Sequence, residues 1–126
     1  MKTAIQIKTA PQPIGSYSQA VKFGDFLFTC QLGLDITGTL AAPDTAAQTQ
    51  QTLENIKIIL EDAGMTMNDV VKTTVYLVNL ADFSVVNEIY GKYFDSPYPA
   101  RACIQAVKLP KEAKIEIEAI AIARNG

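Results

Sequence analysis

The segment PYPARACIQ, residues 97–105, places an arginine beside a cysteine in a chain that is 48% hydrophobic. A strand beginning near Ala100 would alternate its side chains, so Arg101 and Cys103 would point to the same face. A guanidinium offers two parallel N–H groups that match a carboxylate, which makes Arg101 a candidate anchor for an anionic ligand. The alternative interpretation is a rim arginine paired with a neighbouring acidic side chain.

Two carboxylates form the second candidate group. The segment KIEIEAIAIA, residues 114–123, places Glu116 and Glu118 on one face of another predicted strand. The chain has no histidine, which excludes Ser-His and Cys-His nucleophile pairs. A carboxylate in a cleft is the natural general base in such a chain. A solvated sheet edge is the alternative reading of this pair.

Two cysteines, Cys30 and Cys103, are too few for a disulfide framework, and without histidine they do not make a zinc site. Cys103 is more typical of a small buried side chain than of a nucleophile, although its backbone carbonyl could accept a hydrogen bond. Tyr17 could stack on a flat ligand or simply pack. Asn87 could equally be an ordinary surface residue.

Composition limits the class of protein. The chain has 126 residues, which predicts one domain spanning 1–126. Its net charge of −2 and pI near 5.0 argue against a nucleic-acid binder, which normally carries a basic patch. No apolar run reaches membrane-spanning length and the first residues do not resemble a signal peptide, so we expect no membrane partner and a cytoplasmic location.

The hydrophobic patterns predict six strands and two helices. A hairpin is expected around Gly24-Asp25, because glycine at the first position of a two-residue loop suits a type II′ turn. A helix is expected from a capping box formed by Thr45 and Gln48 to a terminal Gly64. Other expected strands are 4–9, 69–78, a strand that contains Arg101, and 114–123, and a second helix is expected from near Asn79, with Asp82 in its first turn.

The predicted element order is β-β-β-α-β-α-β-β, which indicates an α+β fold with a mixed β-sheet and two helices on one face. Apolar residues nevertheless occur on both faces of the strands. Val71, Val75 and Leu77 alternate with Tyr76 and Val78, and Ile115 and Ile117 oppose Ile120 and Ile122. An uncovered apolar sheet face needs a partner, so we expect a homo-oligomer that packs sheet against sheet.

Three segments resemble the RidA (YjgF) family: GSYSQAV, VVKTTVYLVNLADFSVVNEIY and YPARACIQAVKLPKEAKIEIEAIAI. The resemblance covers nearly the whole chain. It implies a chorismate-mutase-like homotrimer with a barrel-like core and sites between subunits. It also implies a deaminase that hydrolyses reactive enamines and imines, such as 2-aminoacrylate and 2-aminocrotonate, to 2-keto acids and ammonia. No cofactor is implied, and the partners are small imine and keto-acid ligands.

The resemblance also implies roles for individual residues. Arg101 matches a carboxylate-binding arginine, Glu116 a glutamate that orients water, and Cys103 a cysteine whose carbonyl helps to hold that water. Tyr17 and Asn87 match pocket residues.

The chain departs from the family pattern at FTCQLG, where members usually carry Ser-Gly before the glutamine. Thr29 and Cys30 stand at this substrate-binding segment, which is one residue short, so its usual backbone donor is in question. The loop DITGTL is also shorter than usual. The alternatives are a non-catalytic binder of keto acids on the same scaffold, an RNA-cleaving role, against which the acidic balance argues, and a chaperone-like role.

Overall fold

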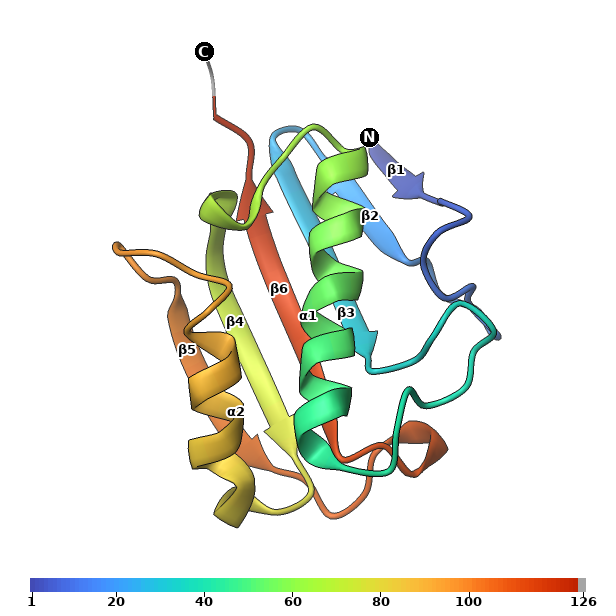
Figure 1. Ribbon diagram of the computed structural model, residues 1–126. Helices are drawn as coiled ribbons and strands as arrows, with labels where there is room; N and C mark the ends of the chain where they lie inside the picture. Colours follow the sequence, from blue (N-terminus) through green and yellow to red (C-terminus); the bar gives the residue numbers. More distant parts are fainter. Residues whose placement is uncertain (125–126) are drawn as a thin grey trace.

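Six strands form one mixed sheet, in the order β1-β2-β3-β6-β4-β5, in the computed structural model, which describes residues 1–124 (Figure 1). Strands β4 and β5 run parallel, whereas the other neighbouring pairs are antiparallel. The strands are β1 (Lys2–Ile5), β2 (Ala20–Phe23), β3 (Phe26–Leu32), β4 (Val70–Leu77), β5 (Ala100–Gln105) and β6 (Ile115–Ile122).

Two helices, α1 (Thr45–Asp62) and α2 (Phe83–Tyr90), lie side by side on one face of the sheet (Figure 1). Three short 3-10 turns complete the chain: η1 (Met67–Asp69), η2 (Leu80–Asp82) and η3 (Pro110–Glu112). The predicted α+β fold with both helices on one face is therefore confirmed. The second helix begins later than predicted, because Asn79 caps η2 by accepting a hydrogen bond from the Ala81 amide.

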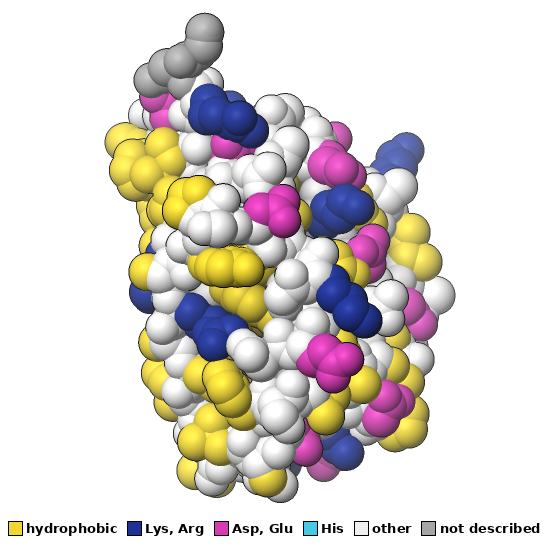
Figure 2. Space-filling model, turned by 60° about the vertical axis from the view of Figure 1, so that its left-hand side comes forward, with side chains coloured by type: hydrophobic (Ala, Val, Ile, Leu, Met, Phe, Trp, Pro, Cys, Tyr) yellow, Lys and Arg dark blue, Asp and Glu magenta, His cyan; other side chains and the backbone are white. Residues whose placement is uncertain are grey.

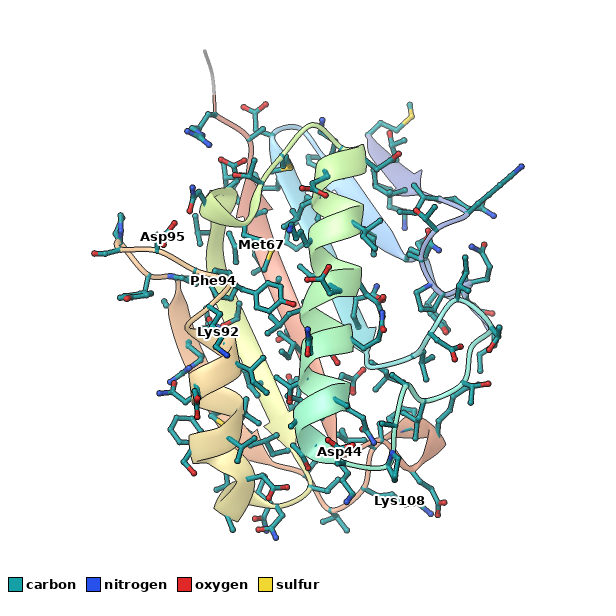
Figure 3. The ribbon with its side chains drawn as sticks, in the orientation of Figure 1. Asp44, Met67, Lys92, Phe94, Asp95 and Lys108 are labelled. Atoms are coloured by element: carbon teal, nitrogen blue, oxygen red, sulfur yellow. The ribbon has the colours of Figure 1, made fainter. Side chains whose placement is uncertain are left out.

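The ends of α1 confirm one predicted signal and correct another. Asp44, at the start of the helix in Figure 3, is the N-cap and accepts a hydrogen bond from the Ala47 amide. The predicted capping box of Thr45 and Gln48 is wrong, because the Gln48 amide group is buried and links Ala42 O to the Lys114 amide. Gly64, with φ +76°, ends the helix as predicted.

The core lies between the helices and one face of the sheet. Side chains from β3, β4 and β6 pack there against α1, α2 and Phe94, which points inward in Figure 3. Full burial of one such Leu or Ile contributes roughly 1.5–3 kcal/mol. The largest fully buried aliphatic side chains of the core are Leu27, Leu53, Ile56, Ile59, Leu60, Val75, Leu77, Val86, Ile115 and Ile117.

Two strand predictions need correction. A β-bulge between Val70 and Lys72 leaves Val71 exposed instead of on the core face with Val75 and Leu77. The first strand is Lys2–Ile5, not 4–9, because the side chain of Gln19 binds the backbone N–H and C=O of Ile7. The Gln19 side chain thus forms the hydrogen bonds with Ile7 that a neighbouring strand would otherwise form.

The sheet face opposite the helices is apolar and exposed, as predicted. Phe23, Phe26, Phe28 and Ile104 have exposed fractions of 55%, 44%, 43% and 47%. All four lie on this face, because residues two apart along a strand share a side and paired residues share a face. We call it the open face. Apolar surface of this kind marks an interaction site.

Candidate functional site

Arg101 lies on the helix-covered face of β5, where it is held by α2. Its Nη1 donates a hydrogen bond to Asn87 Oδ1 over 2.8 Å. The guanidinium carbon lies 5.1 Å from the ring centroid of Phe83 and 4.8 Å from that of Tyr90. These three residues are at positions i, i+4 and i+7 of α2, which places them along one side of the helix. We call Arg101 with Phe83, Asn87 and Tyr90 the anchor cluster.

The anchor cluster favours an anion-binding arginine over a rim ion pair. Among residues 1–124, Arg101 pairs with an amide rather than with a carboxylate. Cation–π contacts fix a guanidinium without neutralising its charge. Arg101 is exposed, so its charge can reach a ligand. Figure 2, with the α2–β5 side forward, shows hydrophobic side chains around basic ones on the left, whereas acidic ones lie mainly to the right and top.

Cys103 shares the face of Arg101, as predicted, since the two pair with Val75 and Thr73 of β4. Burial raises the pKa of its thiol, and the charge of Arg101 only partly offsets this. The Ala106 amide donates a hydrogen bond to Leu77 O, so the backbone groups of Ala106 point toward β4. Successive residues of a strand point their backbone groups to opposite sides, and Cys103 lies three residues before Ala106. The Cys103 carbonyl therefore points to the free edge of the sheet, where it can accept a hydrogen bond.

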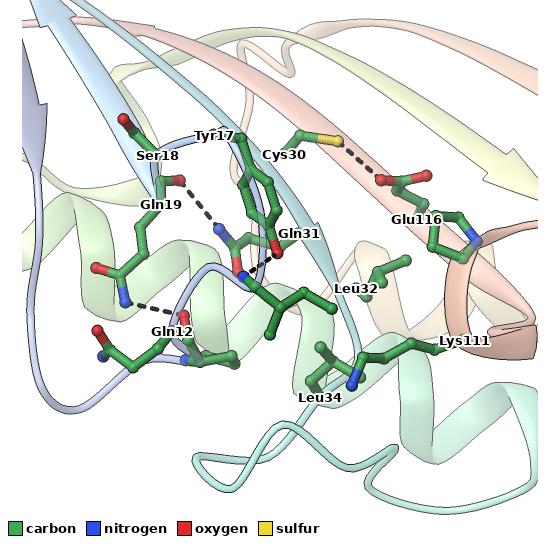
Figure 4. A pocket seen from close by; sticks show the side chains of 13 residues that line it. Gln12, Tyr17, Ser18, Gln19, Cys30, Gln31, Leu32, Leu34, Lys111 and Glu116 are labelled. Atoms are coloured by element: carbon green, nitrogen blue, oxygen red, sulfur yellow. Dashed lines mark hydrogen bonds between the residues drawn. The ribbon is translucent and has the colours of Figure 1, made fainter.

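A pocket of about 410 Å³ lies near the end of β3 and the start of β6 (Figure 4). Tyr17, Cys30 and Glu116 line one part of it, and we call these three the acid pocket. The Cys30 thiol donates a hydrogen bond to Glu116 Oε2 over 3.2 Å. The Tyr17 hydroxyl accepts from the Ile14 amide at 3.2 Å, which holds the ring over the pocket.

Cys30 brings two donors to the acid pocket. Cys30 is an exposed residue, but partial desolvation of its thiol, followed by the hydrogen bond and the charge of Glu116, raises the pKa of the thiol far above the ordinary value, so the thiol stays protonated. The Ala123 amide donates a hydrogen bond to Asp25 O, so the backbone groups of Asp25 point toward β6. Backbone groups alternate sides along β3, and Cys30 lies five residues after Asp25, so the Cys30 amide points away from β6. The pairing with β2 ends at Ala20 and Thr29, so the Cys30 amide lies just beyond that ladder.

Glu116 and Glu118 share the open face, as predicted, but their surroundings differ. Glu116 lines the pocket, whereas Glu118 accepts a hydrogen bond from the Tyr76 hydroxyl at 3.3 Å. Burial and the nearby Glu118 raise the pKa of Tyr76, so its hydroxyl remains a donor. The geometry therefore favours Glu116 over Glu118 as the carboxylate that meets a ligand.

Thr29 does not present its side chain to the pocket. Its hydroxyl is buried, donates to Gln19 O at 2.7 Å and accepts from Gln31 Nε2 at 3.1 Å. A substrate-binding role for the Thr29 side chain has no support in this arrangement. The donor that this segment can still offer is the Cys30 amide, which lies just beyond the β2–β3 ladder.

Lys111 is a pocket residue that the sequence reasoning missed. Its Nζ donates to Gly38 O over 2.8 Å, which ties the 33–44 loop to η3 beside the pocket (Figure 4). Lys111 and Glu112 have φ values of 57° and 56°, a left-handed conformation that non-glycine residues adopt rarely. A Pro-Lys-Glu sequence gives no signal for that conformation, so the pattern could not have revealed it.

The anchor cluster and the acid pocket lie on opposite faces of the sheet. Arg101 pairs with Thr73, which is buried on the helix face, whereas Glu116 pairs with Tyr76 on the open face. Strand β4 also separates β5 from β6, which puts the two strands about 10 Å apart. One chain therefore carries two separate clusters that cannot contact the same small ligand.

In the described part of the chain, no three His, Cys, Asp or Glu side chains are grouped to bind a metal.

No helix in residues 1–124 has the length and hydropathy needed to cross a bilayer.

The sequence model of the endoribonuclease L-PSP family matches residues 7–123. A RutC family protein of Pyrococcus horikoshii is 51% identical over 123 residues, which cover 96% of this chain and 98% of the relative.

Two further relatives carry more specific names. The 2-iminobutanoate/2-iminopropanoate deaminase of Salmonella typhimurium is 43% identical over 128 residues, covering 98% of this chain and all of the relative. The crystal structure of RidA from an Antarctic Psychrobacter superimposes with a TM-score of 0.91 at 44% identity, covering 96% of this chain and 99% of that one.

Proposed function

The chain belongs to the endoribonuclease L-PSP (RidA/YjgF) family, and on that premise we propose that it hydrolyses small 2-imino acids and their enamine tautomers to 2-keto acids and ammonia. The observation that best supports this proposal is the anchor cluster, in which a charged guanidinium is held by an amide and two aromatic rings. Such an arginine suits the carboxylate that every 2-imino acid carries. Relatives named as deaminases of such acids support the proposal.

The proposed site forms between two subunits of a homotrimer. Arg101 and Glu116 point to opposite faces, so a ligand can meet both only if they come from different chains. The open face, which carries Glu116, is also the apolar surface that calls for a partner. The edge of β5, with the Cys103 carbonyl, would then border the acid pocket of the neighbouring subunit.

In the proposed reaction, the enamine first tautomerises to the imine. Arg101 holds the carboxylate through paired N–H groups, with the Cys30 amide as a further donor, and this fixes the imine carbon. A water held by Glu116 and the Cys103 carbonyl adds its oxygen to that carbon. Glu116 takes one proton from this water and passes it to the imine nitrogen. When the C–N bond of the resulting carbinolamine breaks, Glu116 transfers the hydroxyl proton to nitrogen, so that ammonia leaves, a carbonyl forms and the carboxylate is restored. General base assistance of this kind contributes roughly 10²–10⁴-fold.

A coupled assay tests the proposal. A serine or threonine dehydratase generates the enamine, and formation of the keto acid is followed with and without the protein. We expect acceleration by the wild type and none by Arg101→Ala, which should keep its fold because Arg101 is an exposed residue. If the wild type bound keto acids in calorimetry but gave no acceleration, the chain would be a metabolite-binding protein on this scaffold.

A further inference from the structure

Cys30 is the one pocket residue whose side chain contacts Glu116 through a hydrogen bond in the described structure. It lies on β3 opposite Glu118, so it reaches Glu116 diagonally across the β3–β6 pair. The Sγ to Oε2 distance is 3.2 Å, which is a normal length for a thiol donor to oxygen. Glu116 thus has one carboxylate oxygen engaged by the thiol, and its other oxygen can face the pocket (Figure 4).

We propose that the Cys30 thiol is a positioning residue for the deaminase reaction, which fixes Glu116 through Oε2 so that Oε1 binds the attacking water. This inference rests on the proposed function. It assigns a role to the side chain of a residue whose backbone alone was expected to matter. A carboxylate on a strand can turn about its terminal torsion, and a single donor to one oxygen restricts that rotation.

The thiol acts here as a donor and not as a nucleophile. Its protonated state follows from partial desolvation and from the two nearby carboxylates, Glu116 and Glu118, which both disfavour a thiolate. A thiol is a weaker donor than a hydroxyl, so it orients the carboxylate while lowering its basicity only slightly. That combination suits a general base, which must be oriented and still able to accept a proton.

The charged and titratable groups around Glu116 set the expected pH effect. Cys30 faces it from β3, Glu118 follows it on β6, Tyr76 pairs with it on β4, and Lys111 lines the same pocket from η3. Removing the thiol leaves the other groups in place and takes one donor from the ionised carboxylate. The ionised carboxylate is then less well stabilised, so the acid limb of the pH–rate profile should move to higher pH.

The experiment compares Cys30→Ala, Cys30→Ser and the wild type in the coupled assay between pH 5 and 9. For Cys30→Ala we expect kcat to fall about 5- to 10-fold, KM to change less than about twofold, and the acid limb to move upward. Cys30→Ser should restore kcat to within about threefold, with an acid limb at or below that of the wild type, because a hydroxyl is the stronger donor. Phe28→Leu, on the same strand face, controls for altered packing, and light scattering checks assembly.

Two results would overturn the inference without touching the proposed function. A Cys30→Ala variant with the wild-type kcat and acid limb would show that Glu116 needs no thiol donor. Equal losses in Cys30→Ala and Cys30→Ser, at an unchanged acid limb, would reduce Cys30 to a packing residue. An inactive wild type would remove the proposed function and this role together, whereas the first two results leave the deaminase proposal intact.

Discussion

Arg101 and Glu116 point to opposite faces of the same sheet, with β4 between the strands that carry them. A ligand that contacts both residues must therefore take them from two copies of the chain. The proposed site between subunits can therefore be tested by mixing two variants of the chain.

Subunit mixing tests that arrangement directly. Arg101→Ala and Glu116→Gln should each be inactive alone, but trimers assembled from both chains should regain activity. If subunits mix at random in equal amounts, about a quarter of the sites receive Arg101 from one chain and Glu116 from its neighbour, both intact. We expect about a quarter of the wild-type rate from co-expressed chains. A mixture that stays at the level of its parents would contradict a site shared between subunits.

The two glutamates should differ in their effect on turnover. Glu116→Gln keeps the shape of the side chain and loses its basicity, so it should bind 2-oxobutanoate normally in calorimetry while kcat falls by about 10²-fold or more. Glu118→Gln should keep most of the activity, because Glu118 contacts Tyr76 instead of the pocket. A normal Glu116→Gln together with an inactive Glu118→Gln would reverse this assignment.

The aromatic rings of the anchor cluster should control affinity more than rate. Phe83→Leu removes one cation–π contact and keeps an apolar side chain, so we expect KM to rise about three- to tenfold with kcat within about twofold. Arg101→Lys should restore little, because an ammonium cannot form the paired hydrogen bonds of a guanidinium. Ser84→Ala, on the same helix, is the control. A Phe83→Leu variant that lost kcat at constant KM would contradict a role in holding Arg101.

The thiol of Cys30 should react slowly with alkylating agents. Its raised pKa keeps the thiolate fraction low, so the rate should still be rising with pH at pH 9, the ordinary value for a cysteine. Glu116→Gln removes the negative charge that accepts the hydrogen bond of that thiol, and it should increase the alkylation rate at pH 8. A Cys103→Ala background makes Cys30 the single thiol for mass spectrometry. An unchanged rate in Glu116→Gln would contradict the hydrogen bond between them.

Gly33 should be intolerant of any side chain. A Cβ atom there would lie 2.8 Å from Gln48 Cα and closer still to the Gln48 carbonyl, both of which are helix backbone and cannot move aside. We expect Gly33→Ala to lower the free energy of unfolding by about 2–4 kcal/mol. Gly24→Ala is the matched control. It meets nothing within 4 Å but has φ +58°, so about 1–2 kcal/mol is expected in urea unfolding.

The alternation of apolar residues was sufficient to predict the sheet and the uncovered face, and the glycine of a two-residue loop was sufficient to predict the hairpin at Gly24. These features depend on local periodicity, which is visible in one chain. The capping box failed because Gln48 makes its hydrogen bonds with residues far away in the sequence. The prediction that Val71 lies on the core face failed because the extra residue of a β-bulge changes the face of a side chain, and no pattern in the sequence reveals the bulge.

Several residues of the candidate site could be named from the sequence, but their arrangement could not. Arg101 and Glu116 were recognisable from residue type and family resemblance, and the shared face of Arg101 and Cys103 followed from strand alternation. The contact of Phe83 and Tyr90 with Arg101 depends on how α2 packs over β5, which no local pattern specifies. The left-handed turn at Lys111 likewise arises from tertiary contacts.

The protonated thiol beside Glu116 also bears on chemoselectivity. An imine carbon accepts any nearby nucleophile, and a thiolate would compete with water for it and leave a sulfur adduct in place of a keto acid. Because partial desolvation and the neighbouring Glu116 keep the Cys30 sulfur protonated, water would be the stronger competitor for the imine carbon in the proposed reaction. A cysteine can thus line the pocket of an electrophilic ligand without forming an adduct with it, and the carboxylate that is proposed to activate the water also helps to keep the sulfur protonated.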